Sequence, residues 1–282
     1  MSDAAGRRAA RAPSVDAAAR RAALHAVGAT LAALALSAAA PARAGAYEDF
    51  LKAVRRDDSL AVERLLRRGF DANAVDPDGV PAIVLSMREG AFKVARLLAA
   101  QPSIQIDRAS PLGETALMVA SHRGELDLAR LFVERGAEVN RPGWAPLHYA
   151  AAGGHAALVE YLLEASAYID AESPNRTTPL MMAARQKQFS VAKLLVEQGA
   201  DPTLRNDAGL SAADYLERQG DADAANFLRG RADAFAARYG VSPRATVVGQ
   251  PGGRRVEGAT APRVPMAPAG RLPGERPAGA ER

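Results

Sequence analysis

The sequence has no cysteine among its 282 residues, and aromatic residues make up only 5% of it. Without cysteine there is no disulfide framework, no thiolate metal site and no lipidated cysteine anchor. The three histidines that follow residue 44 lack metal-ligand spacings such as H-x-x-x-H, and no acidic residue is placed as a third ligand. We therefore expect no metal site and no cofactor.

Motifs of nucleophilic and phosphate-binding chemistry are absent too. The chain contains no G-x-S-x-G, no G-x-x-x-x-G-K-S/T and no G-x-G-x-x-G. The adjacent pair Asp57 and Asp58 is typical of a solvated helix end rather than of a catalytic pair. We expect no catalytic residue, and we expect that the protein is not an enzyme.

Net positive charge is confined to the two ends of the chain. Residues 1–44 contain six Arg and two Asp, and residues 241–282 contain seven Arg and three Glu, so each end carries +4. The whole chain also carries +4, which leaves −4 for residues 45–240. The calculated pI of 9.6 describes the ends, and it does not indicate a nucleic-acid partner for the central part.

The most prominent feature of the sequence is an internal repeat. Six nine-residue segments echo one another, and their starts are 33, 34, 30, 33 and 33 residues apart: 48–56, 81–89, 115–123, 145–153, 178–186 and 211–219. A fixed period in this range indicates a solenoid, in which each unit buries its apolar face against its neighbours.

Each unit is predicted to be a helix, a tight turn, a second helix and a loop. Thr178 is a good N-cap and Pro179 suits the first helical position. Gly199 falls just past the second helix, where a left-handed residue is needed. The small residues Ala183 and Ala184 allow close helix packing.

The fragments GWAPLHYAAAGGHAALVEYLLEASAYID (143–170) and GETALMVASHRGELDLARLFVERGAEVN (113–140) resemble the ankyrin repeat. The resemblance covers about residues 47–231. It implies an all-α solenoid of about six helix-turn-helix repeats with short β-finger loops, over residues 45–240. We expect the repeats near 47–75, 76–107, 108–140, 141–170, 171–204 and 205–240.

Departures from the pattern carry expectations of their own. Pro102 and Ser166 stand where the second and fourth units should have glycine, and proline cannot take a positive φ. The loop before Trp144 is three residues short, so that finger should be stunted. Phe227, Leu228, Phe235 and Tyr239 are predicted to lie on a helical segment that caps the stack.

Both ends of the chain are predicted to lie outside the repeats. Residues 1–44 have a basic start, an Ala-rich apolar stretch and an A-x-A site, as a cleaved secretory signal does. Cleavage after Ala44 or Ala46 fits equally, and an uncleaved anchor or a downstream start codon is an open alternative. Residues 241–282 are Pro-, Gly- and Arg-rich and are expected to be disordered.

One repeat position is a candidate binding stripe. The residue seven places after each echo's start is basic in five units, with Arg123 beside it: Arg55, Arg88, His122, Arg185 and Arg218. The resemblance implies that this position opens onto a concave groove, so the stripe suits an acidic segment of a partner protein. The alternative is that these residues only keep the surface soluble.

Two aromatic residues are candidate anchors in the same groove. Trp144 lies at the tip of the shortened finger, and Tyr149 is predicted to face the groove from the first helix of that unit. Exposed Trp and Tyr are preferred interface residues. Alternatively, Trp144 folds back to fill the space left by the short loop. His148 belongs to the T-P-L-H-like motif, and we expect it to be structural.

We expect a monomeric, non-catalytic module that binds a partner protein in the groove, with no nucleic-acid partner. The Ala- and Arg-rich composition is typical of a high-GC bacterium, and with the signal segment it predicts a periplasmic protein without a membrane span after cleavage. The alternatives are a secreted effector that acts on host proteins, an immunity protein that blocks an exported toxin, and a form anchored in the inner membrane.

Overall fold

The structure is a computed structural model of the chain, and it describes residues 45–240. The chain divides into two compact units after Phe50. Residues 45–50 are helical, and the description below concerns residues 51–240. The predicted signal segment and the predicted disordered tail lie outside the described residues.

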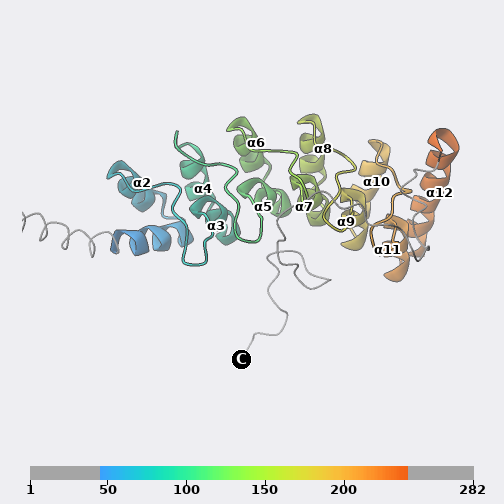
Figure 1. The fold of residues 1–282 in the computed structure, drawn as a ribbon, viewed down its shortest axis with the longest axis horizontal. Coiled ribbons are helices and arrows are strands. Elements are labelled where there is room, and N and C mark those ends of the chain that lie inside the picture. Colours follow the sequence, from blue (N-terminus) through green and yellow to red (C-terminus); the bar gives the residue numbers. More distant parts are fainter. Residues whose placement is uncertain (1–44, 241–282) are drawn as a thin grey trace, which may run out of the picture. The chain divides into compact units, whose positions relative to one another are not determined.

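After a helical stretch at 51–55, the helices follow one another in pairs (Figure 1): α2 (Ser59–Arg67), α3 (Ala82–Glu89), α4 (Phe92–Ala99), α5 (Ala116–Arg123), α6 (Leu126–Glu134), α7 (Pro146–Gly153), α8 (Ala156–Glu164), α9 (Pro179–Arg185), α10 (Phe189–Glu197), α11 (Ala212–Arg218) and α12 (Ala222–Tyr239).

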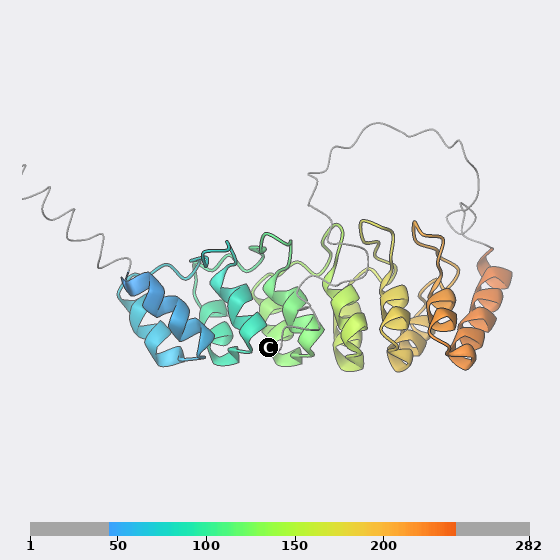
Figure 2. The same ribbon diagram turned by 90° about the horizontal axis from the view of Figure 1, so that it is seen from below.

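The pairs stack into two layers. The odd-numbered helices from α3 to α11 contact one another in chain order and form the inner layer. The even-numbered helices from α2 to α12 do the same in the outer layer. Long loops project from one edge of the stack (Figure 2). The predicted all-α repeat solenoid is therefore confirmed.

Local sequence explains where the inner helices begin. The side chains of Thr115, Thr178 and Ser211 cap α5, α9 and α11, each accepting a hydrogen bond from a backbone N–H three residues on. Proline takes the first helical position of α7 and α9, where its missing N–H has no helical partner to lose. The predicted roles of Thr178 and Pro179 are confirmed.

A column of buried side chains runs through the stack. One residue of each outer helix from α4 to α12 is at most 1% exposed at the same repeat position: Leu98, Phe132, Leu162, Leu195 and Leu228. The inner helices are buried on most sides because a neighbour lies to each side and an outer helix behind. Ala183 and Ala184 are fully buried in α9, as close packing requires.

The turn inside each repeat holds a left-handed residue. The φ values are +54° at Asp57, +76° at Gly90, +77° at Gly124, +76° at Gly154, +58° at Lys187 and +78° at Gly220. Asp57 and Lys187 show that the turn tolerates a side chain in two repeats. At Gly124, however, a Cβ atom would lie 2.5 Å from His155 Nδ1 of the next repeat, so glycine is required there by a close approach as well.

Gly124→Ala is expected to lower the free energy of unfolding by about 1–2 kcal/mol, because it combines a positive φ with displacement of His155. Displacing the ring also weakens the 2.9 Å hydrogen bond between His155 Nε2 and the His122 backbone oxygen. Urea unfolding measures the change. The matched control is Gly136→Ala, since Gly136 has φ +90° with open space around it. Equal losses in both variants would mean that the His155 contact contributes nothing.

The finger loops share one turn. A polar side chain at the first turn position accepts backbone N–H groups later in the loop at Asp76, Ser110, Ser173 and Asn206. The same four residues donate their own backbone N–H to the oxygen four residues on. The finger at 140–145 has no such bond in the structure, since three residues are missing from it. The predicted stunted finger is therefore present.

The two residues that stand in place of the expected glycine, Ser166 and Pro102, differ in backbone conformation. Ser166 takes φ +66° where other repeats have glycine. The turn around Pro102 contains no positive φ, and the chain instead closes through hydrogen bonds from Gln101 N to Leu98 O and from Ile104 N to Gln101 O. The turn there differs, as predicted.

The last outer helix caps the stack only in its first half. Leu228 is 1% exposed, and the Phe227 ring meets the edge of Phe189 with centroids 5.6 Å apart. The rings of Phe235 and Tyr239 lie tilted against each other with centroids 4.8 Å apart, but Tyr239 is 63% exposed. The predicted sealing role holds for Phe227 and Leu228 and is wrong for Tyr239.

The first turn corrects another prediction. Asp58 caps α2 by accepting the Ala61 N–H at 2.9 Å, and Asp57 Oδ1 accepts the Val94 N–H of the next repeat at 2.9 Å. The pair is structural and not merely solvated. The N-cap could be predicted from the sequence, because an aspartate directly precedes Ser59 and an apolar run. The hydrogen bond between Asp57 and the backbone of the next repeat could not.

Side chains join successive repeats at a position that the sequence analysis missed. Asn73, Asp107, Asn140 and Asp170 each accept a backbone N–H of the following repeat, from Gln105, Glu138, Tyr168 and Asp201 at 2.8, 3.0, 2.8 and 3.1 Å. We call these four residues the carboxyl-amide ladder. Each bond fixes one repeat against the next.

Candidate functional site: the inner face

The ends of the inner helices, together with the finger loops, form what we call the inner face. The predicted stripe residues lie at these helix ends. Arg55, His122, Arg123 and Arg218 are exposed, and Arg88 and Arg185 are half-buried. Ala152 is buried and interrupts the stripe. The residues recur at one position, as the sequence predicts, but their surroundings differ from repeat to repeat.

In the first two repeats, the arginines of the stripe are paired with carboxylates of the same chain. Arg55 pairs with Asp76 at 3.7 Å, and Asp76 is 5% exposed. The Arg88 guanidinium pairs with the buried carboxylate of Glu114 on the next finger and lies 3.2 Å from Ser110 Oγ. Arg88 Nε is buried without a hydrogen-bond partner in the described structure. These two arginines bind fingers of their own chain.

The third repeat presents Arg123 and His122. Arg123 Nη1 donates to the Arg88 backbone oxygen at 3.2 Å, and its guanidinium lies 5.5 Å from the Phe92 ring centroid. The exposed His122 ring meets the edge of Tyr149 at 6.4 Å. No carboxylate of the described residues lies within 4.0 Å of Arg123, so its charge is not compensated there.

Arg185 and Arg218 are the cations of the C-terminal repeats. Neither has a carboxylate within 4.0 Å among the described residues, in contrast to Arg55 and Arg88. Gln219 Nε2 donates to the Arg185 backbone oxygen at 2.7 Å, which holds α9 and α11 in register at this point. Two uncompensated guanidinium groups therefore lie on adjacent inner helices.

The two aromatic residues that were predicted as anchors differ in their exposure. Tyr149 is 4% exposed, and burial raises the pKa of its hydroxyl. The prediction that Tyr149 faces a partner is wrong, because the α5–α7 contact encloses its ring. Trp144 is half-buried and packs on Ala152 and Met182. Its ring also meets the edge of His148 at 5.3 Å, so it fills the space beside the short finger and keeps part of its surface exposed.

His148 is structural, as predicted. Its Nδ1 accepts the Ala145 N–H at 3.1 Å, and its Nε2 lies 2.9 Å from the Thr177 backbone oxygen. These contacts require a neutral ring that donates through Nε2. Burial lowers the pKa of His148 to about 4, so the ring is neutral at physiological pH.

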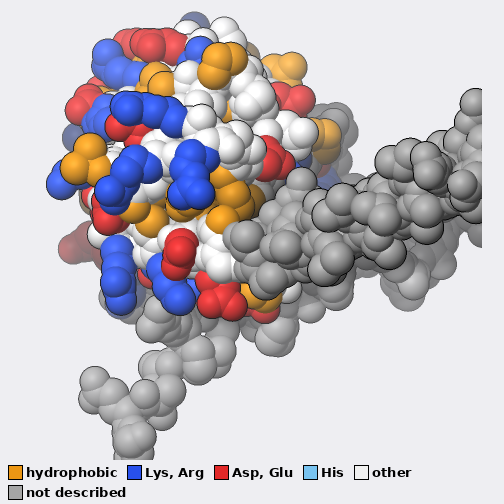
Figure 3. Space-filling view, turned by 90° about the vertical axis from the view of Figure 1, so that its left-hand side faces the viewer, with side chains coloured by type: hydrophobic (Ala, Val, Ile, Leu, Met, Phe, Trp, Pro, Cys, Tyr) orange, Lys and Arg blue, Asp and Glu red, His pale blue; other side chains and the backbone are white. Residues whose placement is uncertain are grey.

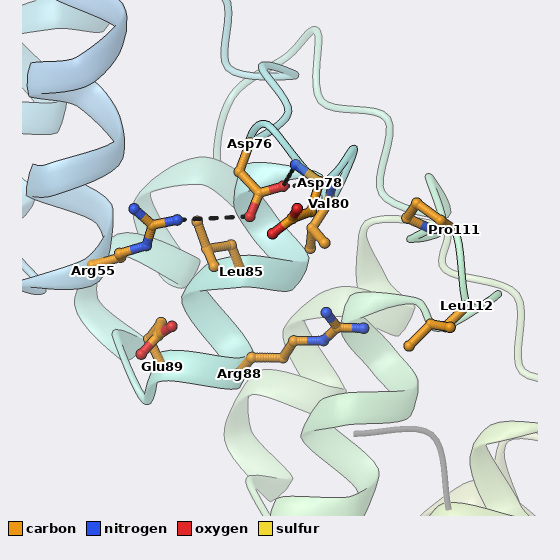
Figure 4. Close-up of a pocket in the computed structure, with 9 residues that line it drawn as sticks. All are labelled: Arg55, Asp76, Asp78, Val80, Leu85, Arg88, Glu89, Pro111 and Leu112. Atoms are coloured by element: carbon orange, nitrogen blue, oxygen red, sulfur yellow. Dashed lines mark hydrogen bonds and ion pairs between the residues drawn. The ribbon is translucent and has the colours of Figure 1, made fainter. Parts of the chain in front are cut away.

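A hollow of about 420 Å³ opens on the inner face between the second and third repeats (Figure 4). Leu85 and Val80 are its buried apolar wall, and Leu112 at a fingertip is 52% exposed. Charged side chains surround them: Arg55, Asp76, Asp78, Arg88 and Glu89. This hollow could not be predicted from the sequence, because it depends on how two fingers stack on one helix.

The N-terminal end of the stack has no field of a single sign. Figure 3 views this end, and it shows Lys and Arg interspersed with Asp, Glu and hydrophobic side chains. Arg67, for example, pairs with Glu63 on α2.

Two kinds of feature are absent from the part of the chain that the structure describes. It holds no cluster of three His, Asp or Glu side chains that could bind a metal ion. Between residues 45 and 240, no helix has the length and apolar character needed to cross a membrane. The features that the inner face presents for binding are uncompensated cations, a hollow and a half-buried tryptophan.

Known proteins resemble this chain in its repeats. The family of ankyrin repeats (3 copies) matches residues 50–142 and 139–206. A putative ankyrin repeat-containing protein of Treponema pallidum (strain Nichols) is 27% identical over 170 residues, which cover 60% of this chain and 47% of that protein. The nuclear factor NF-kappa-B p105 subunit of Gallus gallus is 30% identical over 161 residues, 55% of this chain and 16% of its own length.

A plant protein extends the comparison. The ankyrin repeat-containing protein ITN1 of Arabidopsis thaliana is 38% identical over 117 residues, covering 40% of this chain and 18% of that protein. This chain thus spans less than half the length of each of these relatives. The part of the chain that matches the family is the repeat region, residues 50–206. The chain belongs to the ankyrin-repeat family, whose members generally serve as protein-protein interaction modules.

Proposed function

We propose that the chain is a non-catalytic module that binds a partner protein on the inner face, in the bacterial periplasm after export. The observation that carries the proposal is the pair Arg185 and Arg218. They lie on neighbouring inner helices, whose axes usually pack about 8–10 Å apart, and their guanidinium groups have no carboxylate within 4.0 Å among the described residues. An acidic segment of the partner supplies the missing charge.

The two pairs of arginines have different roles in this proposal. Arg88 holds the buried Glu114, so reversing its charge would place two carboxylates together and destabilise the stack. Arg185 and Arg218 can be reversed without breaking an ion pair of the described structure. They therefore separate binding from folding, which Arg88 cannot do.

Arg185→Glu with Arg218→Glu is expected to weaken binding of the partner at least tenfold, mainly by repulsion of its acidic segment. The measurement is the Kd of the full chain for the partner at two salt concentrations. The matched control is Arg64→Glu with Lys93→Glu, which makes the same charge change at exposed positions of the outer helices α2 and α4. An unchanged Kd in the inner-face variant, or an equal loss in the control, would contradict the proposed site.

The location is tested separately. Cell fractionation with a C-terminal tag is expected to recover the chain from the periplasm, shortened by 44 or 46 residues. Recovery from the medium would support a secreted effector instead, and full-length recovery with the inner membrane would support an anchored form.

A further inference from the structure

The charges around the hollow are not balanced. Its two cations are already used: Arg55 pairs with Asp76 and Arg88 with Glu114. Asp78 and Glu89 also line the hollow and are exposed. Neither has a cationic side chain within 4.0 Å among the described residues. The hollow thus has two carboxylates whose charge the described part of the chain does not neutralise.

These two carboxylates are not part of the repeat framework. At the fingertip position of Asp78, the other full-length fingers have Leu112, Asn175 and Ala208. At the position of Glu89, next to the basic stripe, the other repeats have Arg56, Arg123, Gly153, Gln186 and Gln219. The fold therefore needs no acid at either position, and both acids occur in the same repeat.

The apolar part of the hollow lies between the two carboxylates. Figure 4 shows Leu85 at the centre, with Asp78 on the finger side and Glu89 on the opposite side. Pro111 and the half-exposed Leu112 close the far end. An aliphatic surface with uncompensated carboxylates around it matches a side chain that has an apolar stem and a cationic head, as lysine and arginine do.

We propose that the hollow binds a lysine or arginine side chain from an extended segment of the partner protein. The stem of that side chain packs on Leu85, and the two carboxylates that flank Leu85, those of Asp78 and Glu89, attract its cationic head. This inference builds on the proposed function. Because Arg185 and Arg218 lie at the other end of the inner face, the partner segment is basic at one end and acidic at the other, which fixes the direction in which it binds.

The test uses defined peptides rather than the partner. The full chain, labelled with ¹⁵N, is titrated with acetyl-Gly-Ser-Lys-Ser-Gly-amide and followed by NMR. The expected result is saturable movement of the amide signals of Asp78, Gly79, Leu112 and Gly113 at millimolar peptide, weakened by salt. The same peptide with norleucine or glutamate in place of lysine is expected to bind at least fivefold more weakly.

Matched variants locate the effect. Asp78→Asn with Glu89→Gln keeps the shape of the hollow and is expected to weaken binding of the lysine peptide at least fivefold. Glu160→Gln with Glu164→Gln removes two exposed carboxylates of the outer helix α8 and is expected to leave that binding unchanged. Equal responses to the lysine, norleucine and glutamate peptides would overturn the proposal, as would binding unaffected by Asp78→Asn with Glu89→Gln. Neither result depends on the partner, so the hollow can fail while the proposed function stands, and the reverse.

Discussion

Replacing His148 by alanine is expected to lower the free energy of unfolding by about 3–4 kcal/mol at neutral pH. The change removes the acceptor of the Ala145 N–H and the donor to the Thr177 oxygen. Each buried backbone group left without a partner costs about 1–3 kcal/mol, and the edge contact with Trp144 is lost too. Urea unfolding measures the effect, and a loss below about 1 kcal/mol would contradict this role.

The same residue makes stability depend on pH. Burial lowers the pKa of His148 to about 4 in the folded state, against about 6.5 when unfolded. The unfolded chain therefore binds the proton first as pH falls, and the contribution is present above pH 6.5 and lost toward pH 4. The full difference is about 3 kcal/mol. His148→Ala is expected to lack this slope, and an identical slope in both proteins would contradict the assignment.

Replacing Asp170 by asparagine is expected to stabilise the protein by about 2 kcal/mol at neutral pH. Burial is the main reason that the pKa of Asp170 is raised to about 6, and the nearby Asp201 and Glu172 add to it. Asparagine keeps the acceptor for the Asp201 N–H and removes the charge. Asn73 and Asn140 already hold this ladder position in other repeats, where their amides also donate to the Ser103 and Ser166 oxygens.

The gain from Asp170→Asn must follow pH in the opposite direction to the His148 contribution. A carboxyl with a raised folded pKa binds its proton more tightly when folded, so its cost appears as pH rises from about 4 to 6. Asp170→Asn is therefore expected to stabilise above pH 6 and to have little effect below pH 4. The control is Asp107→Asn at the same ladder position, where the carboxyl is less buried and the gain should be smaller. Stabilisation that is constant from pH 4 to 8 would contradict the account.

These two contributions oppose each other in the native protein. Between pH 4 and 6 the His148 contribution grows as pH rises while the Asp170 contribution declines. The free energy of unfolding of the native protein should therefore depend only weakly on pH through these groups. His148→Ala should show the pH dependence due to Asp170, and Asp170→Asn should show the pH dependence due to His148. Unfolding measured at pH 4, 5, 6 and 7 for the three proteins is sufficient to separate them.

The repeat sequence predicted the fold because each unit repeats its own local signals. Thr178, Pro179 and the recurring leucines specify helix starts and a buried column without long-range information. Departures from the repeat pattern such as Pro102, Ser166 and the short finger could also be predicted, since their effects stay within one loop. The exposure of Tyr239 could not be predicted, because it depends on where the stack ends relative to α12.

The inner face was predicted less well. Periodicity placed Arg55, Arg88, Arg185 and Arg218 at one repeat position, but it could not show which of them are paired. Pairing depends on Asp76 and Glu114, which lie on fingers 21 and 26 residues away in the chain. The burial of Tyr149 and the presence of the hollow follow from the same finger-to-helix stacking.

The most direct test of the account is affinity capture with the tagged full chain from crosslinked envelope extract, run in parallel with two variants. The account predicts that one stoichiometric partner is captured by the native chain and by Arg64→Glu with Lys93→Glu, and that it is lost with Arg185→Glu and Arg218→Glu. Recovery of the same proteins in all three experiments, or of none above background, would contradict binding of a periplasmic partner on the inner face.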